Sequence, residues 1–202
     1  MNRPFLPLWI SIFASLVAIA IAIGANETLL DRGGSLTRWT ARFGMPLFLV
    51  SFAASSLRHF VKQAWTASLL RQRRYWGLGF ALVHTVHMIG FSLVVWNDDV
   101  SQSFADLVGG GSIYGVMYLM VITSNNWSVR TLGRFWRWLH LVGSHALWIG
   151  FTVAYTSRLF GITLGAEFSP WDLVSAAFLY SVMILRIAAI VDRRRKSKLR
   201  SS

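Results

Sequence analysis

The 202-residue sequence contains no cysteine. This absence excludes disulfides, thiolate catalysis, iron–sulfur clusters, cysteine-rich zinc sites and covalently attached haem. Charged residues are also scarce, at 14% against about 25% in soluble domains, whereas 54% of the residues are hydrophobic. With a mean hydropathy of +0.50, this composition excludes a disordered chain and argues against a soluble enzyme. Any cofactor must then be held by histidine, carboxylate or packing.

Six apolar segments predict an all-α integral membrane protein, a six-transmembrane-helix bundle, because each approaches the roughly 20 residues that cross a bilayer as a helix. The segments are residues 6–23, 39–57, 75–96, 107–123, 138–155 and 171–190. None shows the alternating pattern of a membrane barrel. The first could instead be a signal peptide, since Arg3 precedes it, but its apolar length favours an uncleaved helix. We expect residues 1–192 to form one domain and 193–202 a basic cytoplasmic tail.

Acidic residues are few, with 8 Asp and Glu against 20 Lys and Arg, so that the formal net charge is +12. Most of the cations fall in the N-terminal head, the loops after the second and fourth spans, and the tail. The positive-inside rule then places both termini in the cytoplasm and the chain in the inner (plasma) membrane as a multi-pass protein. Topology and contact with the lipid bilayer account for the basic charge, so nucleic acid is not expected as a partner.

Four of the five histidines lie inside two of the predicted spans, His84 and His87 in the third and His140 and His145 in the fifth. An ionisable group within a membrane helix is a functional hypothesis by default. His84 and His87 lie close to one helix face, whereas His140 and His145 diverge by about 140°. His59, at the end of the second span, is expected to be an interfacial histidine.

Depth in the membrane relates the two spans. Counted from Arg74 and Arg137, which open the spans, His84 lies about 15 Å deep and His145 about 12 Å deep. Both spans run in the same direction, so two rings can lie level across a helix interface, as in a bis-histidine haem protein. We predict one haem b between the third and fifth helices, with its iron held by two of the four histidines. The alternatives are buried histidines bonded to neighbouring side chains, or a zinc ion, although no carboxylate lies at these depths.

Arg42, near the start of the second span, is the one strong internal charge that we expect within a span. It is a candidate partner for the haem propionates, because a guanidinium forms two parallel bonds with a carboxylate. The alternative is an arginine that snorkels to the lipid headgroups. Such sparse charge argues against a transport pathway for a charged substrate.

Two stretches of the sequence carry a family resemblance. They are RRYWGL at 73–78 followed by VHTVH at 83–87, and ITSNN at 122–126 followed by VR at 129–130, LGR at 132–134 and WLH at 138–140. These resemble the third span and the fourth-to-fifth junction of the ferric reductase-like transmembrane domain family. That family includes eukaryotic ferric reductases, NADPH oxidases and the bacterial haem subunit of the periplasmic methionine-sulfoxide reductase system.

The resemblance implies a six-helix haem b domain that moves electrons across the membrane. The donor would be quinol or a separate cytoplasmic flavin reductase, and the acceptor would be ferric iron, oxygen or a periplasmic protein. His87 and His140 match family histidine positions, and His84 and His145 resemble the extra pair of short bacterial members. In this setting the chain would be an electron-transfer subunit of an oxidoreductase.

Two features depart from the larger members of that family. Two-haem members carry histidines 13 or 14 residues apart in these spans, but Val153 and Leu70 stand at the corresponding positions here, so one haem is expected. No flavin domain or dinucleotide fingerprint follows the last span, so we do not expect the chain to take hydride from a nicotinamide by itself. The alternative function is a haem-free membrane anchor or an assembly subunit of a larger complex.

Overall fold

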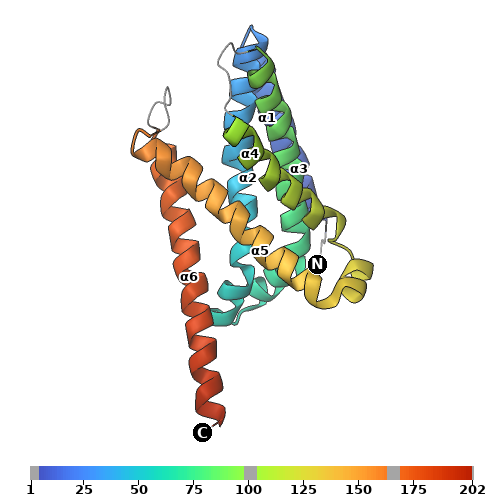
Figure 1. Cartoon of the computed structure of the whole chain (residues 1–202), viewed down its shortest axis with the longest axis vertical. Helices are drawn as coiled ribbons and strands as arrows, with labels where there is room; N and C mark the ends of the chain where they lie inside the picture. The colour runs from blue at the N-terminus through green and yellow to red at the C-terminus, as the bar shows by residue number, and fades with distance from the viewer. Residues whose placement is uncertain (1–4, 98–103, 163–168, 202) are drawn as a thin grey trace.

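The computed structural model describes residues 5–97, 104–162 and 169–201, which form six α-helices and no strand (Figure 1). The helices are α1 (Leu6–Gly24), α2 (Leu29–Phe60), α3 (Ala64–Asn97), α4 (Phe104–Ile122), α5 (Asn126–Leu159) and α6 (Pro170–Ser201). The predicted all-α class is confirmed for this part of the chain.

Four of the helices, α1, α2, α3 and α6, are long and apolar enough to cross a membrane. In α4 the apolar part is the shorter stretch Gly109–Ile122. In α5, Arg130, Arg134 and Arg137 precede the apolar stretch 138–155, and this stretch contains two histidines, so hydropathy does not mark α5 as a span. Several long apolar helices are compatible with the predicted multi-pass membrane protein.

The helices are longer than the predicted spans because they continue through the basic segments. α3 begins at Ala64, so Arg71, Arg73 and Arg74 lie in its first turns and not in the predicted loop. α5 likewise begins at Asn126, ahead of its arginines. A helix of 34 residues is about 50 Å long, whereas the hydrocarbon core of a bilayer is about 30 Å thick. The ends of α3 and α5 would therefore extend beyond that core.

Local signals fix the start and the bend of α5. The side chain of Asn125 caps the helix by accepting a hydrogen bond from the Ser128 backbone N–H at 2.8 Å. Gly133 has φ +47° and ψ −107°, a conformation that residues with a side chain rarely adopt, and it bends the helix. The bend separates a short N-terminal segment from the part of α5 that carries His140 and His145.

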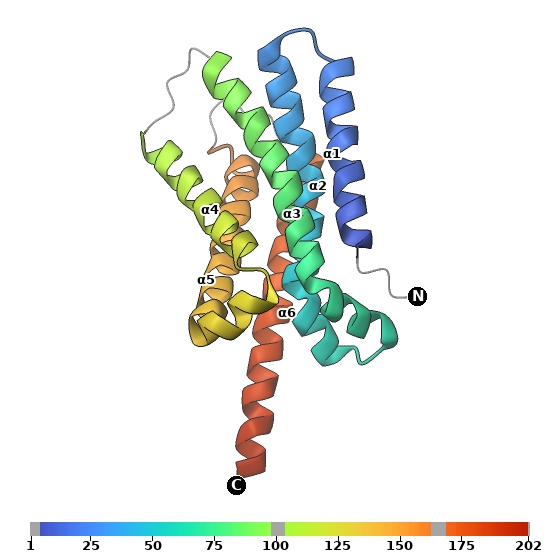
Figure 2. The ribbon, with the colours of Figure 1, turned by 90° about the vertical axis from the view of Figure 1, so that its right-hand side faces the viewer.

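Helices α1, α2 and α3 pack side by side, whereas α4 and α5 lean away from them and α6 extends past the other helices (Figure 2). The contact between α2 and α3 is the most extensive in the molecule. Gly90 permits it, because a Cβ at this position would lie 2.8 Å from Thr37 Oγ1 and 2.9 Å from the Thr37 backbone nitrogen. The α2–α3 connection, the α4–α5 connection and the C-terminus all lie at one end of the molecule, which we call the basic end (Figures 1 and 2).

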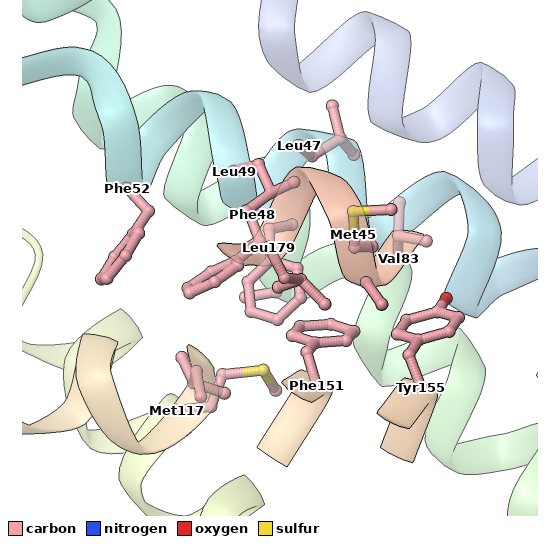
Figure 3. Close-up of a cluster of buried hydrophobic side chains, with 14 residues drawn as sticks. Met45, Leu47, Phe48, Leu49, Phe52, Val83, Met117, Phe151, Tyr155 and Leu179 are labelled. Carbon is pink, nitrogen blue, oxygen red and sulfur yellow. The ribbon is translucent and has the colours of Figure 1, made fainter. Parts of the chain in front are cut away.

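The main hydrophobic core joins α2 and α3 to α4, α5 and α6. It contains Phe48 and Phe52 of α2, Phe80 of α3 and Phe151 of α5, all of them buried. In Figure 3, Phe151 and Tyr155 point from α5 toward side chains of α2 and toward Val83 of α3. The helices that carry the four candidate histidines therefore face a common aromatic core.

Candidate functional site: the histidines of α3 and α5 and the basic end

The two histidines of α3 lie against each other near the middle of the helix. Their rings are parallel, with centroids 4.7 Å apart and an interplanar angle of 2°. His84 also packs on Phe80 and Tyr114, and its Nδ1 atom is buried without a hydrogen-bond partner. Pairing on one helix face is what the three-residue spacing predicts.

His87 is held across the α2–α3 interface through its Nδ1 atom, which lies 2.9 Å from the Thr37 carbonyl oxygen and 3.1 Å from Thr40 Oγ1. The hydroxyl of Thr40 donates to the Leu36 carbonyl at 2.6 Å, so its oxygen acts as an acceptor toward the ring. Both contacts thus require an N–H on Nδ1, which leaves the lone pair of His87 on Nε2. An Nδ1–H bonded to a backbone carbonyl is how proteins orient metal-binding histidines.

His145 of α5 shows the same arrangement within its own helix. Its Nδ1 atom lies 2.7 Å from the Leu141 carbonyl oxygen, so this nitrogen carries the hydrogen and Nε2 keeps the lone pair. The ring meets the edge of Phe52 at a centroid distance of 5.4 Å. His87 and His145, one on each of the two predicted haem helices, are therefore in the tautomer that a haem iron requires.

His140 has a different environment near the basic end. Thr123 donates its hydroxyl to the Leu119 carbonyl, so Thr123 Oγ1 accepts from His140 Nε2 at 3.2 Å. The His140 ring also stacks on Trp136, with centroids 4.2 Å apart. These contacts tie His140 to the α4–α5 connection. They do not bring it to the other three histidines.

An aromatic cluster stands between the α3 and α5 histidines. Phe48 contacts Phe52, Phe80 and Phe151, with ring centroids 5.2, 5.3 and 5.5 Å away. Phe80 and Phe151 pack on His84, and Phe52 packs on His145. A path of ring contacts thus links the two helices, but in the described part of the chain no α3 histidine touches an α5 histidine.

The predicted ligand set can be tested against this donor chemistry. Within residues 5–97, 104–162 and 169–201 there is no group of three or more His, Asp or Glu side chains that could hold a metal ion, so the geometry gives no zinc site. A haem needs two imidazoles only, and His87 and His145 offer Nε2 lone pairs of fixed orientation. These two residues fit the group in donor chemistry, and the four phenylalanines would have to make room for the macrocycle.

Arg42 lies on the other side of α2, toward α1 and α6. Its guanidinium stands over the rings of Trp39 and Trp171, 5.0 and 6.0 Å from their centroids. It also lines an apolar groove together with Pro46 and Trp76. None of its contacts in the described residues is to a histidine.

A cavity of about 370 Å3 lies at the basic end. Arg73 and Arg74 of α3, Arg137 of α5 and Arg186 of α6 all line it. Contrary to the prediction, Arg42 is therefore not the one strong internal charge, because Arg186 is a second one. The sequence does indicate Arg186 as an internal charge, since this residue lies well within the sixth predicted span, 171–190.

Arg186 is the buried member of this group, with 8% of its surface exposed. Its Nη1 donates to the Phe52 carbonyl at 2.7 Å, and the guanidinium lies 4.0 Å from the centre of the Phe52 ring. Its Nε has no partner. A buried donor without a partner destabilises a fold by about 1–3 kcal/mol, and by more when it is charged. Sequence alone gives no such pairing, because it depends on how α6 packs on α2.

No protein-family model, no curated protein and no solved structure matches this chain. The resemblance to the ferric reductase-like family therefore depends on the sequence motifs alone and stays a prediction.

Proposed function

We propose that the protein is a membrane haem b protein that carries electrons from quinol or a separate cytoplasmic flavoprotein to an outer acceptor. The observation that carries this proposal is the matched state of His87 and His145. Each has its Nδ1–H bonded to a backbone carbonyl, at 2.9 and 2.7 Å, and each keeps its lone pair on Nε2. We assign these two residues as the axial ligands of one haem between α3 and α5.

The chain's own residues would do three things in this function. Thr37 and Thr40 hold the His87 ring across a helix interface, and the Leu141 carbonyl holds the His145 ring. The phenylalanines of the core exclude water from between α3 and α5. When bound, the haem supplies a one-electron redox centre, and fixed imidazoles and an apolar environment set its potential.

The proposal includes six membrane spans with both termini in the cytoplasm. The support is the arrangement of the basic segments, since the α2–α3 connection, the α4–α5 connection and the C-terminal part of α6 lie at one end (Figures 1 and 2). The positive-inside rule assigns that end to the cytoplasm. α4 and α5 would then cross the membrane in contact with the other helices, which relaxes the hydropathy that each needs.

A spectrum of the purified full-length protein tests the ligand assignment. The wild type should carry one noncovalent haem b per chain by pyridine haemochrome, with a low-spin spectrum. His87→Ala and His145→Ala should each lose most of the haem. His84→Ala and His140→Ala are the matched controls, and they should keep a low-spin spectrum. A colourless wild type from haem-replete cells would refute the proposal in favour of a haem-free anchor, and an intact spectrum in His145→Ala would refute the ligand pair.

Electron transfer itself can be measured in proteoliposomes that contain ferricyanide. Addition of a quinol outside should reduce the haem and then the enclosed ferricyanide, and both signals should be absent in His145→Ala vesicles. Reduction of the haem without any loss of ferricyanide would refute transfer across the membrane.

A further inference from the structure

We propose that the cavity at the basic end binds a phosphate-bearing ligand with an apolar portion. The cavity lies among α2, α3, α4, α5 and α6 and has a volume of about 370 Å3, within the about 300–1,000 Å3 range of small-molecule sites. The cavity shares Phe48, Phe52 and Phe80 with the aromatic cluster between α3 and α5, but its arginines and the two proposed haem ligands, His87 and His145, are different residues. The argument for a bound anion therefore does not depend on the proposed haem.

Charge is the first argument. Four arginines line the cavity, and its lining includes no acidic residue. Of the eight acidic residues of the chain, Asp192 is the one in the sequence segments at this end, and it pairs with His59 and Lys196, at 2.7 Å each. Four guanidinium groups around one cavity thus have no carboxylate to neutralise them, and an anion is the missing partner.

The state of Arg186 is the second argument, and it separates this cavity from an ordinary basic surface. Arg186 is 8% exposed, it lines the cavity, and its Nε lacks a partner. Its two contacts are to the Phe52 carbonyl and the Phe52 ring, and neither carries a negative charge that would compensate the guanidinium. Positive-inside topology explains arginines at a membrane surface, but it gives no reason for a buried one with a free donor.

The positions of the other arginines complete a recognition site. Arg73 is half-buried and is fixed by a bond from its Nε to the Ser51 carbonyl at 3.0 Å, so its terminal nitrogens stay available. Arg74 and Arg137 are exposed and line the cavity from α3 and α5. Guanidinium groups match phosphate geometry in pairs, which favours a phosphate over a halide or a single carboxylate.

The walls indicate what else the ligand carries. Phe48, Phe80, Leu147 and Trp136 line the same cavity, and its volume far exceeds that of one phosphate group. A phosphate attached to an apolar body matches both parts. Such a ligand has two sources, an acidic phospholipid of the bilayer or a soluble phosphorylated compound. His140 also lines the cavity, so we assign it to this site and not to the haem.

The test uses the full-length protein in nanodiscs of zwitterionic phosphatidylcholine. Two probes are added, inorganic pyrophosphate followed by calorimetry, and phosphatidic acid in the lipid mixture followed by native mass spectrometry. The variant is Arg74→Gln/Arg137→Gln, which removes two exposed lining arginines and spares the buried one. The matched control is Arg71→Gln/Arg134→Gln, which has the same net charge and alters exposed arginines on the same two helices outside the cavity lining.

We expect at least one probe to bind the wild type at one per chain, and the lining variant to bind it at least tenfold more weakly. The control should stay within about twofold of the wild type. Binding of phosphatidic acid alone assigns the lipid source, and binding of pyrophosphate assigns the soluble source. Equal weakening in both double variants, or no binding of either probe to the wild type, would overturn the site.

Haem content keeps this test apart from that of the proposed function. The lining variant should retain the wild-type haem content. If it loses haem in step with the loss of probe binding, the anion is the propionate pair of the haem and a separate phosphate site is refuted. If the wild type holds no haem and still binds a probe, the proposed function fails and this inference stands.

Discussion

Helices α1 to α3 pack with their backbones close together, whereas helices α4 to α6 lie farther apart. In the first group, glycines and small side chains bring helix backbones close together, as where Gly90 of α3 meets Thr37 of α2. In the second group the helices spread apart (Figure 2), and α5 contacts α2 and α3 through large side chains such as Phe151 and Tyr155 (Figure 3). Small-residue packing is rigid, whereas large side chains can change rotamer.

The same difference applies to the histidines. His87 is oriented by two residues of a neighbouring helix, and its position is therefore set by the α2–α3 interface. His145 is oriented by Leu141 of its own helix, so it can move when α5 moves. A cofactor between them would be bound by one preformed side and one adaptable side. To admit the cofactor, α5 and the phenylalanine side chains between α3 and α5 would have to move.

Truncating the ring that joins the two groups should have the largest effect on stability. Phe151 is 8% exposed and contacts Phe48, Phe80 and His84. Phe151→Ala should lower the free energy of unfolding by about 3–5 kcal/mol, measured by denaturant titration in micelles. The control is Val153→Ala, because Val153 is 61% exposed and two residues away, and its loss should be well under 1 kcal/mol. Equal losses would show that α5 does not depend on this core.

The all-helical fold could be predicted from sequence because apolar runs of membrane length leave few other structures. The helix lengths could not. Hydropathy shows where a chain can lie in lipid, but α3 begins before Arg71, Arg73 and Arg74 and continues through them into the apolar run, since arginine is a good helix former. The bend at Gly133 could not be predicted from the sequence either, because glycine is common in membrane helices and its φ depends on tertiary packing.

The tight α2–α3 contact predicts the second effect. Gly90→Ala would place a Cβ 2.9 Å from the backbone nitrogen of Thr37, which cannot move aside as a side chain can. We expect a loss of about 1–3 kcal/mol in stability and a lower melting temperature in nanodiscs. Gly115 of α4 is the matched position, since nothing lies within 4 Å of a Cβ there. Gly115→Ala should leave the melting temperature unchanged or raise it, and a fall as large as that of Gly90→Ala would contradict the comparison.

The candidate site was predictable only in part. Sequence singled out the four histidines and their two helices, but residue counting could not choose among them. His84 and His145 are the level pair, whereas hydrogen bonds to carbonyls of Thr37 and Leu141 favour His87 and His145. Those bonds depend on interhelical register and ring rotation, which no spacing rule contains. The pairing of Arg186 with Phe52 has the same origin, since it joins residues 134 positions apart in the chain.

The smallest effect concerns Arg42, which connects the two groups from α2 to Trp171 of α6. Its guanidinium lies 5.0 Å from the Trp39 ring and 6.0 Å from the Trp171 ring, and a cation–π contact contributes about 0.5–1 kcal/mol at a partly exposed site. Arg42→Gln should therefore lower stability by about that amount, seen as a small fall in melting temperature. Arg38→Gln, which changes an exposed arginine one turn away, is the control and should not change the melting temperature.

The haem midpoint potential of Arg42→Gln and Arg38→Gln decides whether Arg42 packs on the tryptophans or binds the haem propionates, as the sequence suggests. If the Arg42 guanidinium makes only the cation–π contacts with the two tryptophans, the midpoint potential of Arg42→Gln should equal that of the wild type. A lower potential in Arg42→Gln alone would assign Arg42 to the propionates, because removal of a nearby positive charge favours the oxidised state.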